Sequence, residues 1–170
     1  MTHRAYVALG SNLGERAENL RAAIAALDTL AGTKVTAASS LYVSPAVGAD
    51  EPQPDYFNGV VGLDTALAPH ELLAALQRIE HDAGRTRIAG VRNTARTLDL
   101  DILLFDDQVI AERGLNVPHP RLHDRAFVLL PLTEIAPDCV VPGLGPVRGL
   151  LPRVAGQHIA RVPDPALPAR

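Results

Sequence analysis

The chain of 170 residues has no tryptophan, one cysteine and one lysine. Because Cys139 has no second cysteine to pair with, an internal disulfide is excluded, and so is a zinc site built from several thiolates. Aromatic residues make up only 4% of the chain, so aliphatic side chains and alanine must fill most of the core. The length suits one domain. We expect that residues 1–170 form it, with a proline-rich tail over about 159–170.

Excess positive charge and long apolar runs are also missing. The formal net charge is −3, so the overall charge gives no reason to expect a nucleic-acid partner. No apolar run approaches the roughly 18 residues of a membrane span, and the apolar run at the N-terminus is too short for a signal peptide. We therefore expect a cytoplasmic protein that binds neither nucleic acid nor membrane.

Hydrophobic patterns predict the order strand, helix, strand, strand, helix, strand. We expect strands at 5–10, 34–43, 56–65 and 96–105, and helices at about 15–31 and from Pro69 to Gly84. Asn12 with Glu15 resembles a capping box before the first helix. A short return strand is expected near Val109–Ile110, and the segment after His158 is expected to pack loosely. This order is typical of a ferredoxin-like α+β fold, an antiparallel sheet with helices packed on it. C-terminal helices on the other face would complete α-β-α layers.

The stretch RTLDLDILLF, residues 96–105, is apolar but carries Asp99 and Asp101. In a strand these two side chains point to the same face, with about 7 Å between their Cα atoms. Two carboxylates this close repel each other, and desolvating them is costly unless something compensates. A divalent cation is one compensation, and oxygen ligands favour magnesium. The alternative is a solvated strand face on which each aspartate pairs with an arginine.

An arginine-rich segment precedes this strand. Four arginines fall within twelve residues of one another, next to the two aspartates: Arg85, Arg87, Arg92 and Arg96. Guanidinium groups beside a metal site suit a polyphosphate, whose charge they neutralise together with the metal. A surface loop rich in arginine would show the same pattern. The turn GSNLG lacks the lysine of a P-loop, so we interpret it as a structural turn.

Five stretches together resemble a known family. In order they are YVALGSNLG, PDYFNGVV, LQRIEHDAGRTR, RTLDLDILLF and VPHPRLHDRAFVLLPL. The sequence resembles the 6-hydroxymethyl-7,8-dihydropterin pyrophosphokinases of folate biosynthesis over roughly residues 3–150. The resemblance implies a ferredoxin-like monomer that transfers the terminal diphosphate of ATP to the hydroxymethyl group of the dihydropterin and releases AMP. It also implies two magnesium ions.

The resemblance implies three sets of site residues. The residues acting on the transferring phosphates are Arg85, Arg96, Asp99 and Asp101, and the two aspartates also hold the metal. The pterin contacts are Ser44, Pro45, Ala46, Val47, Tyr56, Asn58 and Phe127. Of these, Tyr56 and Phe127 stack on the ring, and Asn58 binds its edge. The ATP site is lined by Gln77, Glu80, Arg87, Ile102, Asn116, His119 and Arg125. The sequence does not choose between His119 and Asp101 as a general base.

Two other functions remain open from the residues. A ferredoxin-like regulatory module would bind a nucleotide without chemistry, and a magnesium-dependent phosphohydrolase would cleave ATP without a pterin. Neither explains why Tyr56, Asn58 and Phe127 occur in the same chain as the aspartate strand.

Overall fold

The computed structural model describes residues 2–46, 53–84 and 97–163. The strands are β1 (His3–Ser11), β2 (Thr33–Ala38), β3 (Tyr42–Ser44), β4 (Tyr56–Thr65), β5 (Asp99–Phe105), β6 (Ile110–Glu112), β7 (Leu115–Val117), β8 (Val140–Val141), β9 (Gly145–Pro146) and β10 (Ala160–Arg161). The helices are α1 (Arg16–Asp28), α2 (Pro69–Asp82) and α3 (Ala126–Ile135), with the 3₁₀ helices η1 (Leu122–Asp124) and η2 (Val147–Val154).

The main sheet is antiparallel and has the order β10-β3-β4-β1-β5, with β2 also paired to β4. The long strand β4 pairs with β3 near its start and with β2 near its end. When β2 and β3 are taken as one position, the chain runs strand, helix, strand, strand, helix, strand, which confirms the ferredoxin-like prediction.

The single strand expected at 34–43 is wrong, because the chain forms two strands there. Between them, Ser39 N–H donates to Val60 O at 2.9 Å and Ser39 Oγ accepts from Val60 N–H at 3.0 Å. Ser40 turns to the carboxylate of Glu134, which accepts from its N–H at 3.0 Å. Serine side chains that bond to nearby backbone interrupt regular ladders.

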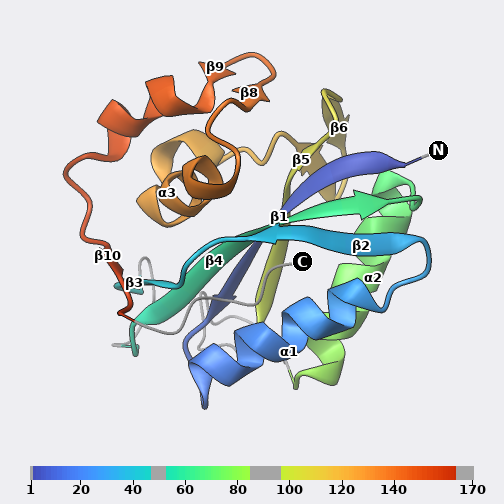
Figure 1. Ribbon diagram of the computed structural model, residues 1–170, viewed down its shortest axis with the longest axis horizontal. Coiled ribbons are helices and arrows are strands. Elements are labelled where there is room, and N and C mark those ends of the chain that lie inside the picture. Colours follow the sequence, from blue (N-terminus) through green and yellow to red (C-terminus); the bar gives the residue numbers. More distant parts are fainter. Residues whose placement is uncertain (1, 47–52, 85–96, 164–170) are drawn as a thin grey trace.

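Helices cover both faces of the sheet, which confirms the predicted α-β-α layers (Figure 1). On one face α1 and α2 pack on a core that includes Val7, Leu63 and Leu100. On the other, α3 and η2 pack on a core that includes Val60 and Leu103.

Strand β5 alternates as expected at its start. Leu100 and Ile102 are buried in the core beneath α1 and α2, whereas Asp99 and Asp101 are half-buried on the α3 face. The pairing with β1 then shifts by one residue, since Val7 pairs with Ile102 and Tyr6 with Leu104. The β-bulge inserts Leu103 and reverses the alternation. Ile102 and Phe105 lie in the core beneath α1 and α2, and Leu103 and Leu104 lie in the core beneath α3.

The ends of α2 lie where the sequence predicts them, but the cap predicted for the start of α1 is not formed. Pro69 opens α2, and Gly84 follows it with φ +89°, a conformation that favours glycine. The capping box expected at Asn12 and Glu15 is wrong: Glu15 is the N-cap residue and makes no side-chain cap bond. Asn12 instead bonds to Gln53 and Pro54.

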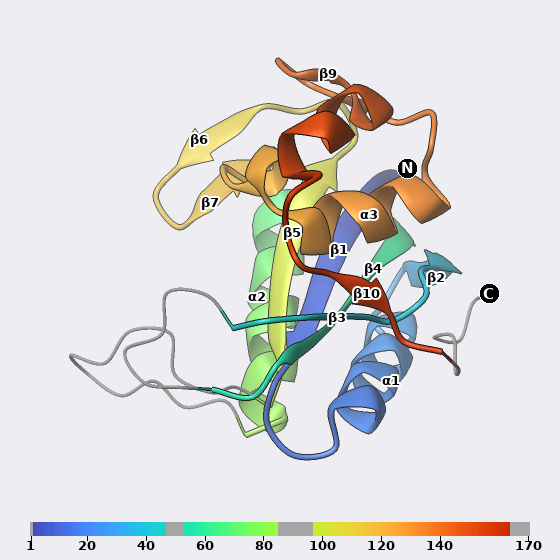
Figure 2. The same cartoon turned by 90° about the vertical axis from the view of Figure 1, so that its left-hand side faces the viewer.

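Two C-terminal segments pair differently from the expectation. The short strand near Val109–Ile110 exists as β6, but it pairs with β7. Part of the segment after His158 forms β10, which pairs with β3 at the edge of the main sheet (Figure 2). None of the helices in the described segments has the length and apolar character needed to cross a membrane.

Candidate active site

A row across four strands brings predicted site residues side by side. Gly10 in β1 pairs with Asn58 in β4 on one side and with Asp99 in β5 on the other, and Asn58 also pairs with Tyr42 in β3. Directly paired residues project to the same face of a sheet. Because neighbouring strands lie about 4.8 Å apart, the Cα atoms of Asn58 and Asp99 are about 10 Å apart.

The glycine in this row leaves space that other groups use. A Cβ atom at Gly10 would lie 3.4 Å from Tyr56 Cδ1 and 3.6 Å from Asn58 Oδ1. The Tyr56 ring and the Asn58 amide oxygen therefore border the space above Gly10. Tyr56 is half-buried, so part of its surface remains available to a ligand.

Asn58 is held in one orientation. Its side chain is buried, and Nδ2 donates to Ser44 Oγ at 2.8 Å. Nδ2 also donates to Tyr56 O at 3.5 Å, so the amide offers its acceptor oxygen to the edge of a polar ring. Ser44 ends β3 and is buried; Pro45, which is exposed, and Ala46, which is half-buried, follow it. Val47 lies outside the described residues.

Arg125 is close enough to Asp99 and Asp101 for charge interaction. The pKa of Arg125 is lowered by burial and by nearby Arg121, while the charges of Asp101 and Asp99 act in the opposite direction. Arg125 directly precedes α3 and is half-buried. The site therefore joins two carboxylates to a partly desolvated guanidinium, an arrangement that suits a polyphosphate with its metal.

His119 lies close enough to Arg125 and Asp99 for charge interaction. Its backbone N–H donates to Leu103 O at 2.9 Å, and its Nδ1 accepts from the N–H of Arg121 at 3.1 Å. Burial, followed by the charge of Arg125, lowers the pKa of His119 from 6.5 to about 4. The imidazole is therefore neutral at neutral pH. Since Nδ1 already accepts a hydrogen bond, Nε2 carries the proton and is available as a donor.

Phe127 lies in the first turn of α3 and is half-buried. The Cζ atom of Arg125 lies 5.4 Å from the centroid of its ring, a cation–π distance. Arg125 thus contacts the aromatic side of the site and interacts through its charge with the acidic side.

Glu80 on α2 forms a hydrogen bond to the backbone of β5. It follows Leu72 and Leu76 at helical spacing on the buried stripe of α2 and is only 7% exposed. Its Oε2 accepts from the N–H of Leu100 at 2.7 Å. Leu100 lies between the two aspartates, and β5 is the last strand at this side of the sheet. The carboxylate therefore satisfies a backbone donor at a sheet edge.

The remaining predicted residues are more scattered. Gln77 is exposed on α2, Asn116 is exposed on β7, and Ile102 is buried on the face of β5 opposite to the aspartates. The predicted residues Arg85, Arg87 and Arg96 lie outside the described residues, as does Arg92.

The sequence analysis missed two residues that hold the start of β4. Arg16 donates to Asp55 O at 2.7 Å, and its Cζ lies 4.1 Å from the centroid of the Phe57 ring. Asn12, which is 1% exposed, donates to Gln53 Oε1 at 3.2 Å. The sequence signal for the role of Asn12 is the turn GSNLG, which we interpreted as structural because its contacts with residues 53–55 depend on the fold.

The two aspartates fit a magnesium site. In the described parts of the chain, no three or more His, Cys, Asp and Glu side chains gather where they could hold a metal ion. Magnesium does not need such a cluster, because it commonly binds one or two carboxylates and keeps water and phosphate oxygens as its other ligands. Asp99 and Asp101 provide hard oxygen atoms on one half-buried face.

The sequence comparisons agree with one another. The family model of 7,8-dihydro-6-hydroxymethylpterin-pyrophosphokinase (HPPK) matches residues 6–137. The 2-amino-4-hydroxy-6-hydroxymethyldihydropteridine pyrophosphokinase of Pseudomonas aeruginosa is 47% identical over 163 residues, which cover 96% of this chain and 99% of the relative. The enzyme of the same name from Haemophilus influenzae is 42% identical over 158 residues, covering 93% and 97%.

Solved structures agree on the fold. Plasmodium falciparum HPPK-DHPS wild type superposes with a TM-score of 0.71 at 16% identity. The match covers 90% of this chain and 45% of the other, so this chain spans less than half of that protein's length. At this identity the match supports the fold alone.

Proposed function

The chain belongs to the 7,8-dihydro-6-hydroxymethylpterin-pyrophosphokinase family, and from this premise we propose how its residues carry out the reaction. The enzyme transfers the terminal diphosphate of ATP to the hydroxymethyl group of 6-hydroxymethyl-7,8-dihydropterin in folate biosynthesis, giving AMP and the pterin diphosphate. The observation that carries the proposal is the row Asn58–Gly10–Asp99, which puts a polar anchor and a carboxylate on one face of the sheet.

The pterin binds over Gly10 in this proposal. Tyr56 and Phe127 stack on its ring, and Asn58, oriented by Ser44, binds its polar edge. An aromatic ring is a suitable contact for a flat heterocycle, and a fixed amide adds direction. The backbone of Ser44–Ala46 completes the contact, together with Val47 as the family resemblance implies.

The phosphates bind beside Asp99 and Asp101. These carboxylates would hold the two magnesium ions, which would supply positive charge to neutralise the phosphates. Arg125 contacts the same region, and His119 donates through Nε2. Gln77, Glu80, Ile102 and Asn116 belong to the ATP side. The family resemblance assigns Arg85, Arg87 and Arg96 to the phosphates as well.

The reaction is an in-line displacement. The oxygen of the pterin hydroxymethyl group forms a bond to the β-phosphorus of ATP, the bond to the oxygen that bridges the α- and β-phosphates breaks, and AMP leaves. The hydroxyl proton is released. Positioning of the two substrates and stabilisation of charge supply most of the rate enhancement in such transfers. With a pKa of about 4, His119 is better suited to donate a hydrogen bond than to act as the base.

The enzyme also acts, in our proposal, as a cytoplasmic monomer formed by one domain. The two cores lie on opposite faces of one sheet, which supports a single folding unit. A regulatory module or an ATP phosphohydrolase is not favoured, because neither accounts for the 47% identity to a pyrophosphokinase over nearly the whole chain.

The test is to measure AMP and pterin diphosphate from ATP and Mg²⁺, with and without 6-hydroxymethyl-7,8-dihydropterin. We expect equal amounts of both products only when pterin and metal are present. AMP formed without the pterin would indicate a hydrolase, and no AMP under either condition would indicate a binding module.

A further inference from the structure

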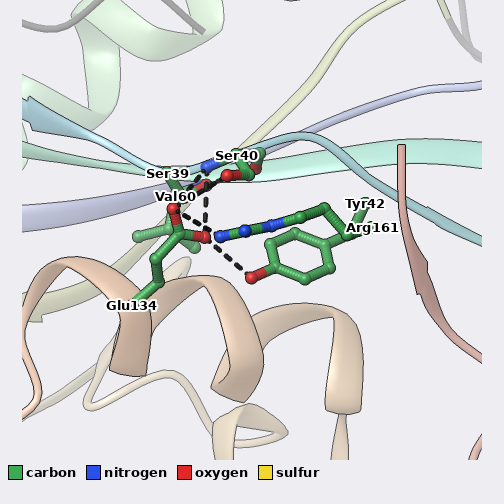
Figure 3. A network of polar contacts seen from close by, with 6 residues as sticks. All are labelled: Ser39, Ser40, Tyr42, Val60, Glu134 and Arg161. Carbon is green, nitrogen blue, oxygen red and sulfur yellow. Dashed lines mark hydrogen bonds and ion pairs between the residues drawn. The ribbon is translucent and has the colours of Figure 1, made fainter. Parts of the chain in front are cut away.

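One carboxylate outside the proposed substrate contacts joins three parts of the fold. Glu134, near the end of α3, accepts from the N–H of Ser40 at 3.1 and 3.0 Å, from Ser40 Oγ at 2.9 Å and from Tyr42 Oη at 2.7 Å. Arg161 of β10 forms an ion pair with it at 3.2 Å. Figure 3 shows these side chains converging on Glu134 between helix and sheet.

The position of Glu134 is unfavourable for the helix itself. The last turn of a helix carries partial negative charge, so a carboxylate there is destabilising, and α3 has no basic residue in that turn. The interactions with β3 and β10 must offset this cost. A residue that violates a local rule in this way often serves something beyond its own element.

The charge state of this group is fixed near neutral pH. Partial burial acts to raise the pKa of Glu134, but hydrogen bonds from Tyr42 and Ser40 outweigh it, so the pKa is lowered. Burial and then the bond to Glu134 raise the pKa of Tyr42 to about 12. An ionised carboxylate therefore accepts from a neutral phenol, which is a charge-assisted hydrogen bond.

Glu134 connects the two sides of the proposed pterin pocket. The first turn of α3 carries Phe127, and the last turn carries Glu134. On the sheet side, Tyr42 belongs to β3, which ends at Ser44, and Ser44 Oγ orients Asn58. Phe127 and Glu134 belong to one continuous helix, so a contact at one end of α3 helps to set the position of Phe127 at the other.

Strand β3 has few other supports. It pairs with β4 through three residues, Tyr42–Asn58, Val43–Phe57 and Ser44–Tyr56, and its other neighbour β10 has only two residues. Such short pairings hold a strand weakly. The bonds from Ser40 and Tyr42 to Glu134 are therefore a substantial part of what fixes β3 against α3.

We infer that Glu134 is a positioning residue that sets the spacing between Phe127 on α3 and the Tyr56–Asn58 wall of the pterin pocket. It thereby affects affinity for the pterin more than affinity for ATP, since Asp99 and Asp101 lie on β5, at the other side of β1, and among the described residues only Arg125, which directly precedes α3, couples the helix to the ATP side. This inference rests on the proposed function, because it assumes that the pterin lies between these walls.

The test compares Glu134→Gln with the wild-type enzyme. Glutamine keeps the shape but places an NH₂ group among donors and removes the charge that pairs with Arg161. We expect the KM for the pterin to rise by about 10-fold, the effect of weakening hydrogen bonds to a charged group. The dissociation constant for the pterin, measured with a non-hydrolysable ATP analogue present, should rise in parallel, while the KM for ATP stays within about twofold.

Two further variants keep the result interpretable. Tyr42→Phe retains Glu134 but removes one hydrogen-bond donor, so it should raise the pterin KM by a smaller factor than Glu134→Gln does. If Glu134→Gln fails to fold, Tyr42→Phe takes its place in the test. The effects of the two changes should be less than additive, because they break a shared hydrogen bond. Glu112→Gln is the matched control, since Glu112 is an exposed glutamate on β6 whose Oε1 lies 3.1 Å from His70 Nε2, and its pterin KM should not change.

The outcomes separate this inference from the proposed function. If wild-type enzyme forms no pterin diphosphate, the proposed function fails. If wild-type enzyme is active and Glu134→Gln loses stability but keeps its pterin KM and dissociation constant, Glu134 is merely structural and the inference is wrong. Equal rises in the KM values for pterin and ATP would overturn it as well.

Discussion

Removing the hydrogen bond between Glu80 and the backbone of Leu100 should lower the unfolding free energy by an amount that follows from the structure. In Glu80→Ala the buried N–H of Leu100 loses its 2.7 Å acceptor. A hydrogen bond to a charged group contributes about 1.5–3 kcal/mol, and losing it leaves a buried donor unsatisfied. Removing the one buried methylene group, Cγ, adds about 0.8 kcal/mol. We therefore expect the unfolding free energy to fall by about 2.3–4 kcal/mol, whereas Glu80→Gln, which keeps an oxygen acceptor, should lose about 1 kcal/mol.

The assay is urea unfolding at pH 7, followed by circular dichroism. Glu71→Ala is the matched control, because Glu71 lies on the same helix and its Oε1 also accepts from a backbone N–H, that of Ala68, at 2.8 Å. This site is exposed, so its loss should cost no more than about 1 kcal/mol. If Glu80→Ala costs no more than Glu71→Ala, the assumption that burial makes the Leu100 bond important is wrong.

Three other predictions concern the site directly. Asp99→Asn or Asp101→Asn should lower AMP release by about 100-fold or more, as expected for removing a group that stabilises the reacting phosphates; near-normal rates in both variants would refute the metal assignment. Asn58→Ala should raise the pterin KM by about 10-fold with little change for ATP, and an equal rise for both substrates would contradict the role of Asn58 at the pterin edge. For His119, the folded pKa of about 4 lies below the ordinary 6.5, so the unfolded chain binds the proton first. Stability of the ligand-free enzyme should therefore fall as pH drops from 6.5 towards 4, and urea midpoints of His119→Gln should depend less on pH in that range.

The sequence predicted the elements whose signals are local. Strand β4 has the expected bounds 56–65, and the alternation around Asp99 and Asp101 holds up to Ile102. Pro69 and Gly84 mark the ends of α2 as expected. In each case the pattern depends on the residues of one segment, so it can be read without knowing the partners.

What the sequence could not predict depends on contacts between distant segments. The bulge at Leu103 and the row Asn58–Gly10–Asp99 are set by strand register. Glu134 bonds to residues more than 90 positions away, and no local pattern marks it apart from its unfavourable place at a helix end.

The central claim is that pterin and metal-bound ATP occupy one site across β4, β1 and β5. The most direct measurement replaces Mg²⁺ with Mn²⁺, adds a non-hydrolysable ATP analogue and 6-hydroxymethyl-7,8-dihydropterin, and follows the NMR signals of the pterin hydroxymethyl protons. Two strand spacings separate Asn58 from Asp99, about 10 Å, so we predict strong paramagnetic broadening that disappears in Asp99→Asn. Pterin signals that remain sharp while the pterin is bound would place the two ligands in separate sites and contradict the account.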